Sequence, residues 1–136
     1  MSPDQHLAGI DLLGTQAFPA QQRYITAELA TSTGLVAKDP AERITAAERF
    51  HDDKEDAAHV LTESWGEPER IGLQTIRLRT ATEEIPEPWA RLSLTMGDVY
   101  LWELTEHGRW AALGVADLDP DDEIQLLLVV TDTDPP

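Results

Sequence analysis

Three polar residues at helical spacing are the first candidates for chemistry in this sequence. His51, Glu55 and His59 recur at four-residue intervals, so one continuous helix would carry all three on the same face. Imidazole and carboxylate groups are common zinc ligands. The compact His-Glu-x-x-His motif is absent, however, and spacing alone does not specify a metal. The sequence therefore predicts no metal site and no cofactor.

Three arginines are the second candidate, a site for an anionic group. Arg77 and Arg79 alternate onto one face of an expected strand, and Arg91 joins them if the next expected strand pairs alongside. Guanidinium groups bind carboxylates and phosphates through paired hydrogen bonds. The competing interpretation is that these arginines pair with Glu83, Glu84 or the acidic helix, because structural ion pairs are commoner than binding sites.

An acidic segment between two apolar segments is the third candidate, a surface for a protein partner. It contains Asp117, Asp119, Asp121, Asp122 and Glu123. A calcium-binding EF-hand needs glycine at its sixth position and glutamate at its twelfth. Counted from Asp117, those positions hold Asp122 and Leu128, so the segment is not an EF-hand. Asp-Pro-Asp-Asp is ordinary turn composition, which predicts a charged hairpin turn.

Motifs for covalent or phosphate chemistry are missing from the sequence. No serine lies in a Gly-x-Ser-x-Gly turn, and neither glycine-rich phosphate loop is present. The chain has no cysteine, which excludes disulfides, thiolate metal sites and a cysteine nucleophile. The sequence assigns no catalytic residue and favours a protein that is not an enzyme.

The elements that must position these residues are clearest in the second half of the chain. Residues 99–105, 110–116 and 124–131 are short apolar segments, rich in β-branched and aromatic residues and separated by turns. Such segments with short connections predict a three-stranded antiparallel meander. Residues 124–131 are apolar on both alternating faces, which indicates an interior strand covered on both sides.

Two further strands are predicted before the meander. Residues 70–80 contain β-branched and leucine side chains, although the apolar side changes faces partway, which suggests a bulge. Residues 89–95 alternate between apolar and polar side chains, as in a strand with one wet face. The intervening residues 83–88 include two prolines and predict a loop.

The first half of the chain is predicted to be helical. Residues 1–18 form a weakly ordered or docking segment, and residues 21–33 carry apolar side chains within helical reach of one another. Asp39 and Pro40 are typical of the cap and first position of another helix. Its apolar pattern extends to Trp65, but six polar residues interrupt it at 51–56. That leaves one long helix or two helices, and we favour a break.

Charge restricts the partners that the protein can have. Its net charge is −16. Residues 39–70 hold four basic and ten acidic side chains (−6), and residues 98–136 hold one and ten (−9). This field repels phosphate backbones and anionic lipid headgroups, so we expect no direct nucleic-acid or membrane binding. The N-terminus lacks the features of a signal peptide, which predicts a cytoplasmic protein.

Together these patterns predict a single α+β domain over residues 1–136. N-terminal helices within residues 19–66 pack on a mostly antiparallel sheet of four to five strands within residues 70–131, which ends in the meander. Residues 132–136 form a tail that frays. Three tryptophans are predicted in the core: Trp65, Trp102 and Trp110.

Two functions follow as hypotheses. The leading one is a non-enzymatic protein that binds a basic protein partner through its acidic surface, as a regulator, an inhibitor or immunity protein, or a nucleic-acid mimic. The alternative is a small-molecule or anion-binding domain, or an enzyme, with a pocket between sheet and helices near the three arginines. A deep pocket lined by converging polar groups favours the alternative, whereas a flat acidic face with an exposed apolar patch favours the leading hypothesis.

Overall fold

A computed structural model describes residues 18, 22–34, 39–105 and 108–136. Five strands form one sheet in the order β1-β5-β4-β3-β2, and every neighbouring pair is antiparallel. The predicted α+β class is confirmed. The predicted docking segment 1–18 lies outside the described residues except for Phe18. In chain order the elements are β1 (Tyr24–Thr31), α2 (Pro40–Trp65), β2 (Glu69–Gly72), α3 (Gln74–Arg79), α4 (Trp89–Thr95), β3 (Asp98–Leu104), β4 (Arg109–Ala116) and β5 (Gln125–Thr131).

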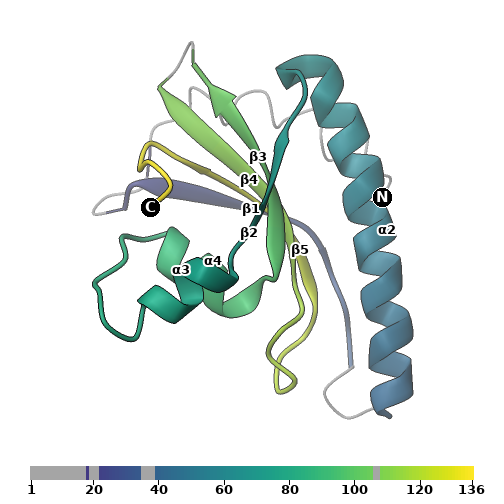
Figure 1. Ribbon diagram of the computed structural model, residues 1–136. Helices are drawn as coiled ribbons and strands as arrows, with labels where there is room; N and C mark the ends of the chain where they lie inside the picture. Colours follow the sequence, from purple (N-terminus) through teal and green to yellow (C-terminus); the bar gives the residue numbers. More distant parts are fainter. Residues whose placement is uncertain (1–17, 19–21, 35–38, 106–107) are drawn as a thin grey trace.

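Helices cover both faces of the sheet. The long helix α2 runs along one face, while the short helices α3 and α4 lie against the other (Figure 1). Side chains that alternate along the strands fill two separate cores. Leu113, Leu128 and Val130 face α2. Ala112 and Val129 face α3 and α4.

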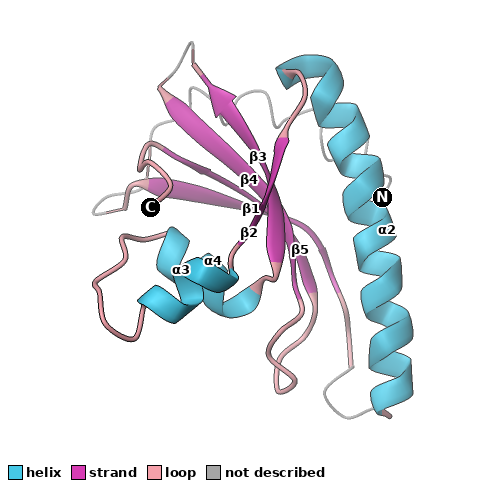
Figure 2. Cartoon of the chain, viewed as in Figure 1, coloured by secondary structure: helices cyan, strands magenta, loops and turns pink. Residues whose placement is uncertain are grey.

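The predicted meander is confirmed. β3 pairs with β4, and β4 pairs with β5 (Figure 2). Leu113 lies opposite Tyr100 on one side and Leu128 on the other. β5 is an interior strand with side chains in both cores, as its doubly apolar pattern predicted. The acidic residues 117–123 fall in the connection between β4 and β5.

α2 is one continuous helix of 26 residues, so the favoured break is wrong. The reason is Lys54, which lies in the polar interruption but is only 3% exposed and continues the inward stripe of Phe50, Ala57 and Leu61. The predicted start is confirmed, because the Asp39 side chain accepts a hydrogen bond from the Ala41 amide at 2.8 Å. No helix in the described ranges is long and apolar enough to cross a membrane.

Residues 24–31 form the edge strand β1, so the predicted helix over residues 21–33 is wrong. β1 pairs with β5, about a hundred residues further along the chain. Ile25, Ala27 and Leu29 pack against the α2-side core, whereas Tyr24 packs against the other core. This two-residue alternation was visible in the sequence. The apolar residues also fit helical spacing, and the strand β5 that pairs with this segment lies too far along the chain to give a local signal.

Most of the two further predicted strands are helical. Only residues 69–72 form a strand, and residues 74–79 and 89–95 form α3 and α4. The buried residues Trp89, Leu92 and Met96 recur at intervals of three and four, which is the helical period. Leu94, which the alternating pattern would bury, is 56% exposed. Segments this short can fit both the helical period and the two-residue alternation of a strand, and tertiary packing determines which structure forms.

The tryptophans are distributed differently from the prediction. Trp102 is buried as expected, but Trp65 and Trp110 are only partly buried, and Trp89 is fully buried. The indole of Trp89 donates a hydrogen bond to the Thr133 carbonyl at 2.9 Å. The indole of Trp110 donates to Asp134 Oδ1 at 3.0 Å. Thr133 and Asp134 are therefore bonded to α4 and β4, and the fraying of residues 132–136 stays a prediction.

Gly114 in β4 leads to a stability prediction. A Cβ atom at this position would lie 2.5 Å from Met96 Sδ and 2.9 Å from Val99 Cγ1. We expect Gly114→Ala to lower the free energy of unfolding by about 1–3 kcal/mol, because the core must shift to admit the methyl group. Gly72→Ala is the control, since nothing lies within 4 Å of its Cβ position. Equal urea midpoints for the two variants would contradict this account of β4 packing.

Candidate functional site

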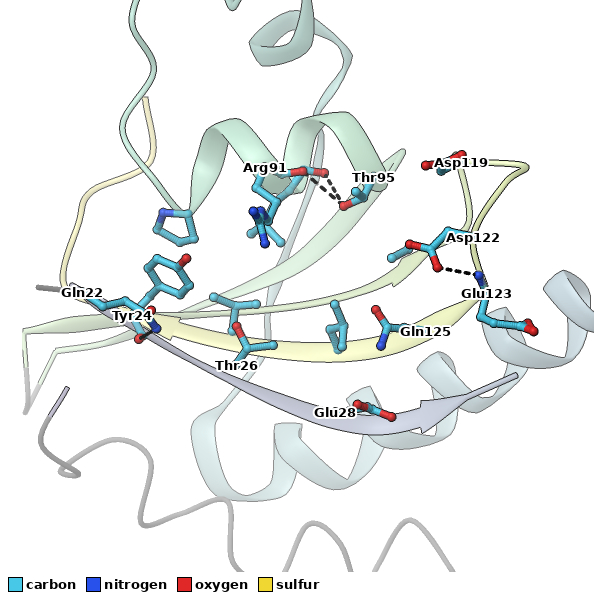
Figure 3. Close-up of a pocket in the computed structure, with 15 residues that line it drawn as sticks. Gln22, Tyr24, Thr26, Glu28, Arg91, Thr95, Asp119, Asp122, Glu123 and Gln125 are labelled. Atoms are coloured by element: carbon cyan, nitrogen blue, oxygen red, sulfur yellow. Dashed lines mark hydrogen bonds between the residues drawn. The ribbon is translucent and has the colours of Figure 1, made fainter. Parts of the chain in front are cut away.

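A pocket of about 600 Å³ lies between α4 and the half of the sheet formed by β1 and β5 (Figure 3). Volumes of roughly 300–1,000 Å³ are usual for small-molecule sites. Its roof comes from α4 and the residue before it, its floor from β1 and β5, and one end from the β4–β5 connection. The main contributors are Arg91, Leu92 and Thr95 from the roof, Tyr24, Thr26, Glu28, Gln125, Leu127 and Val129 from the floor, and Asp119, Asp122 and Glu123 from the end.

The pocket exists because the two faces of the sheet are covered unequally. α2 has 26 residues and so spans about 39 Å. α4 has seven residues and spans only about 10 Å. It covers one part of its face and leaves the strands β1 and β5 beside it open. The alternation along these two strands then directs every second side chain into the uncovered space.

Arg91 is the one cationic residue among the described residues that line this pocket. Its side chain reaches from α4 toward the floor (Figure 3). Its backbone amide donates to Glu87 Oε2 at 3.1 Å, but its guanidinium has no hydrogen bond or ion pair with any residue in the described ranges. An unpaired guanidinium facing a pocket can bind a carboxylate or a phosphate through two hydrogen bonds.

The other two predicted arginines do not join Arg91. The Arg77 guanidinium donates to the backbone carbonyls of Ser93 and Met96, and so ties α3 to α4. Arg79 forms an ion pair with Glu83 at 2.9 Å, one turn further on, and its hydrogen bond lowers the pKa of that carboxyl. The competing interpretation of structural pairing therefore holds for Arg79, and the predicted three-arginine site does not form.

The predicted acidic segment is divided between the pocket and the surface. Asp119, Asp122 and Glu123 line the pocket, whereas Asp117 and Asp121 do not. Asp119 Oδ1 accepts a hydrogen bond from the Asp121 amide at 2.9 Å, and Asp122 Oδ1 accepts one from the Glu123 amide at 2.8 Å. These bonds stiffen the turn and leave the second oxygen of each carboxylate available.

Arg43 of α2 holds this acidic connection in place. Its guanidinium donates to the backbone carbonyls of Asp122 at 2.8 Å, Asp119 at 2.7 Å and Asp117 at 3.3 Å. One side chain thus binds the backbone of the connection at three residues. The end wall of the pocket is therefore attached to the helix on the opposite face of the sheet.

Two more side-chain contacts fix the same connection. His51 Nε2 lies 2.9 Å from Asp117 Oδ2. Ser32, just after β1, donates from its hydroxyl to Glu123 Oε2 at 2.7 Å and accepts from the Ile124 amide at 2.8 Å. The Glu123 carboxylate is thereby turned toward Ser32 and away from the pocket (Figure 3).

The candidate zinc ligands share one helix face but have other contacts. The continuous helix puts His51, Glu55 and His59 at successive turns, while His51 contacts Asp117 and Glu55 accepts a hydrogen bond from the Tyr100 hydroxyl at 2.7 Å. That bond raises the pKa of Tyr100. No group of three metal-ligating side chains is found in the described part of the chain.

An ion cluster around the buried Lys54 of α2 was not predicted. Lys54 Nζ lies 3.2 Å from Asp98 Oδ1, and Arg70 Nη2 lies 2.6 Å from Asp98 Oδ2. Burial tends to raise the pKa of Asp98, but the hydrogen bonds and charges of Arg70 and Lys54 outweigh it and lower that pKa. Asp98 forms ion pairs with both cations, and none of the three residues lines a described pocket. Their role is structural.

A second pocket of about 460 Å³ lies between β2, β3 and the C-terminal tail. Leu101, Trp110 and Pro136 contribute to its wall, and its one arginine, Arg79, is already paired with Glu83. It offers no unpaired cation from the described residues. The pocket beside Arg91 is therefore the stronger candidate for a ligand site.

Sequence reasoning missed the floor of the Arg91 pocket. Tyr24, Thr26 and Glu28 belong to a segment that was predicted to be a helix, so their common face on β1 was not recognised. The alternation of these residues with Ile25 and Ala27 is the signal that would have found them. Comparisons with protein-family models, with curated proteins and with solved structures gave no match.

Proposed function

We propose that this protein binds a small molecule in the pocket between α4 and strands β1 and β5, with Arg91 holding an acidic group of the ligand. The observation that carries this proposal is the unpaired Arg91 guanidinium beside about 600 Å³ of space. This is the alternative function suggested by the sequence, with Arg91 alone of the three arginines at the site. A pocket lined by converging polar groups was the feature expected to favour it.

The remaining lining has the composition of a ligand site. Leu92, Leu127 and Val129 offer apolar surface, while Tyr24 and Gln125 add groups able to form hydrogen bonds. Ligand sites combine a mainly apolar wall with a few polar groups that set orientation. The wall is built on strands and on a packed helix, so it does not need to form when the ligand arrives.

Binding of a basic protein partner, the leading hypothesis from the sequence, remains a second candidate function. Its surface would lie on α2 and not on the 117–123 connection. On α2 the exposed carboxylates of Glu48, Asp52, Asp56 and Glu63 follow the solvent side of the helix, without a hydrogen-bond or ion-pair partner among the described residues. A basic protein could bind this stripe, and salt would then weaken the complex. The 117–123 connection is less suited, because several of its polar groups already bind within the chain.

A thermal-stability screen tests the pocket. We expect at least one member of a panel of carboxylates, phosphate esters, amino acids and amines to raise the melting temperature of the wild-type protein. A ligand at about a hundred times its dissociation constant stabilises the folded state by roughly 2.7 kcal/mol. Arg91→Leu should abolish that shift, because the acidic group loses its partner.

Arg49→Leu is the matched control for this screen. Arg49 is an exposed arginine of α2, on the opposite face of the sheet from the pocket. The control removes the same charge and should keep the ligand-induced shift. A panel without any stabilising compound, or shifts that survive Arg91→Leu, would contradict the proposed function.

A further inference from the structure

The charges around the pocket have opposite signs at separate places. Arg91 belongs to the roof, whereas Asp119 and Asp122 lie at the end formed by the β4–β5 connection, and Glu28 lies on β1 toward that same end (Figure 3). Glu123 also lines the pocket, but its carboxylate is bound to Ser32 and points away from the pocket (Figure 3). The Glu28 carboxylate accepts one hydrogen bond, from the Thr31 hydroxyl, and keeps its second oxygen. The cavity thus presents a cation to one part of a ligand and carboxylates to another.

We infer that the ligand is a zwitterion, an organic molecule with an acidic group at one end and an ammonium or guanidinium group at the other. This inference rests on the proposed function and narrows the class of ligand. The acidic group pairs with Arg91. The basic group lies among Glu28, Asp119 and Asp122.

A ligand with only one kind of charge would pair with one end of the pocket and not with the other. A simple anion paired with Arg91 would lie beside three carboxylates in a protein of net charge −16. A simple cation would pair with the carboxylates at the end of the pocket but would leave the Arg91 guanidinium without a partner. A zwitterion satisfies both ends, and complementary charge of this kind gives specificity.

The floor between the two ends indicates what joins the charged groups. Leu127 and Val129 of β5 lie on the pocket side of the sheet, and Leu92 lies above them on α4. Contact between methylene groups and apolar surface of this kind removes both from water, which favours binding. A short aliphatic spacer therefore fits between the acidic and basic groups.

The carboxylate end is already in position before a ligand binds. Asp119 and Asp122 each accept a backbone hydrogen bond within the turn, and Arg43 binds the backbone carbonyls of both residues. Each carboxylate keeps an oxygen for the ligand. Groups that are fixed beforehand lose less conformational entropy on binding, which favours affinity.

Calorimetric titration with three probes of equal length tests the inference. ε-Aminohexanoate carries both charged groups, hexanoate only the acid, and hexylamine only the base. We expect ε-aminohexanoate to bind on the order of tenfold tighter than either single-charge probe, as one further charged hydrogen bond provides. β-Alanine and γ-aminobutyrate vary the spacer, and their affinities should change with its length.

Two variants test which residues bind each end of the ligand, and a third is the control. Arg91→Gln should reduce the affinity for ε-aminohexanoate to that for hexylamine. Asp122→Asn with Glu28→Gln should reduce it to that for hexanoate. Asp121→Asn is the control, because Asp121 lies in the same turn but does not line the pocket. Its affinity should equal that of the wild type.

The outcomes separate this inference from the proposed function. Equal affinities for hexanoate and ε-aminohexanoate, or for hexylamine and ε-aminohexanoate, overturn the zwitterion and leave a ligand pocket. The same conclusion follows if the three amino acids fail to bind while another panel compound binds in an Arg91-dependent way. If no probe and no panel compound binds, both the inference and the proposed function are wrong.

Discussion

Trp89→Ala should be strongly destabilising, with a loss of about 3–5 kcal/mol in the free energy of unfolding. Trp89 is 0% exposed and lies at the start of α4, in the core between the short helices and the sheet. Truncation leaves a cavity in that core and removes the hydrogen bond to the Thr133 carbonyl. Urea denaturation measures the loss.

Two variants separate packing from hydrogen bonding in this prediction. Trp89→Phe keeps most of the ring and should cost clearly less than Trp89→Ala. Trp110→Ala removes a tryptophan that is partly exposed but also holds the tail, through Asp134. It should cost less than Trp89→Ala, because less apolar surface is lost. A larger loss for Trp110→Ala would mean that the α4 core is not packed as described.

Asp98→Asn should lower the free energy of unfolding by about 3 kcal/mol near neutral pH, the lower end of the range for breaking a buried ion pair. Lys54 is buried, and its ammonium has Asp98 as its ion-pair partner at 3.2 Å. The substitution leaves that charge uncompensated. We expect a loss at the lower end of this range because the Asp98 side chain is 25% exposed and water can reach it. Chemical denaturation at several pH values measures the effect.

The pH dependence of this effect has a definite sign. The pKa of Asp98 is lower in the folded protein than its ordinary value, which is about 3.9. Its contribution to stability is therefore complete above that ordinary value and is lost as the pH falls through the folded pKa. The difference between wild type and Asp98→Asn should shrink below about pH 4 and stay constant toward neutrality.

Lys54→Met provides the control for the ion pair. Methionine fills the buried position without a charge, so this substitution should cost less than Asp98→Asn. In the Lys54→Met background, Asp98→Asn should cost less than it does alone, since no buried ammonium is left unpaired. Additive losses in the two variants would show that Lys54 and Asp98 do not stabilise each other.

The sequence predicted the parts of the fold that local signals determine. The meander could be predicted because its segments are apolar, neighbouring and separated by turns. The start of α2 could be predicted from Asp39 and Pro40, which form a local cap. β1 could not, because its pairing with β5 is a long-range contact. The course of α2 through residues 51–56 depended on Lys54, whose burial is possible only because Asp98 lies opposite it.

The candidate site was predicted only in fragments. Arg91, Asp119 and Asp122 were singled out for separate reasons, as members of an arginine set and of an acidic surface. The structure brings them into one pocket. Their proximity depends on α4, a helix that lies above β1 and β5. The sequence pattern predicted a strand for these residues. Thr26 and Gln125 on the floor have no chemical signature of their own and are recognised only by position.

The most direct test of the proposed function is nuclear magnetic resonance mapping of a bound ligand on the full chain. Backbone amide shifts should be recorded during titration with ε-aminohexanoate or with the best compound of the thermal screen. The expected result is perturbation centred on Arg91, Thr26 and Leu127. Perturbation centred on Leu101 and Trp110, beside the second pocket, or no saturable perturbation by any screened compound, would contradict a ligand site between α4 and strands β1 and β5.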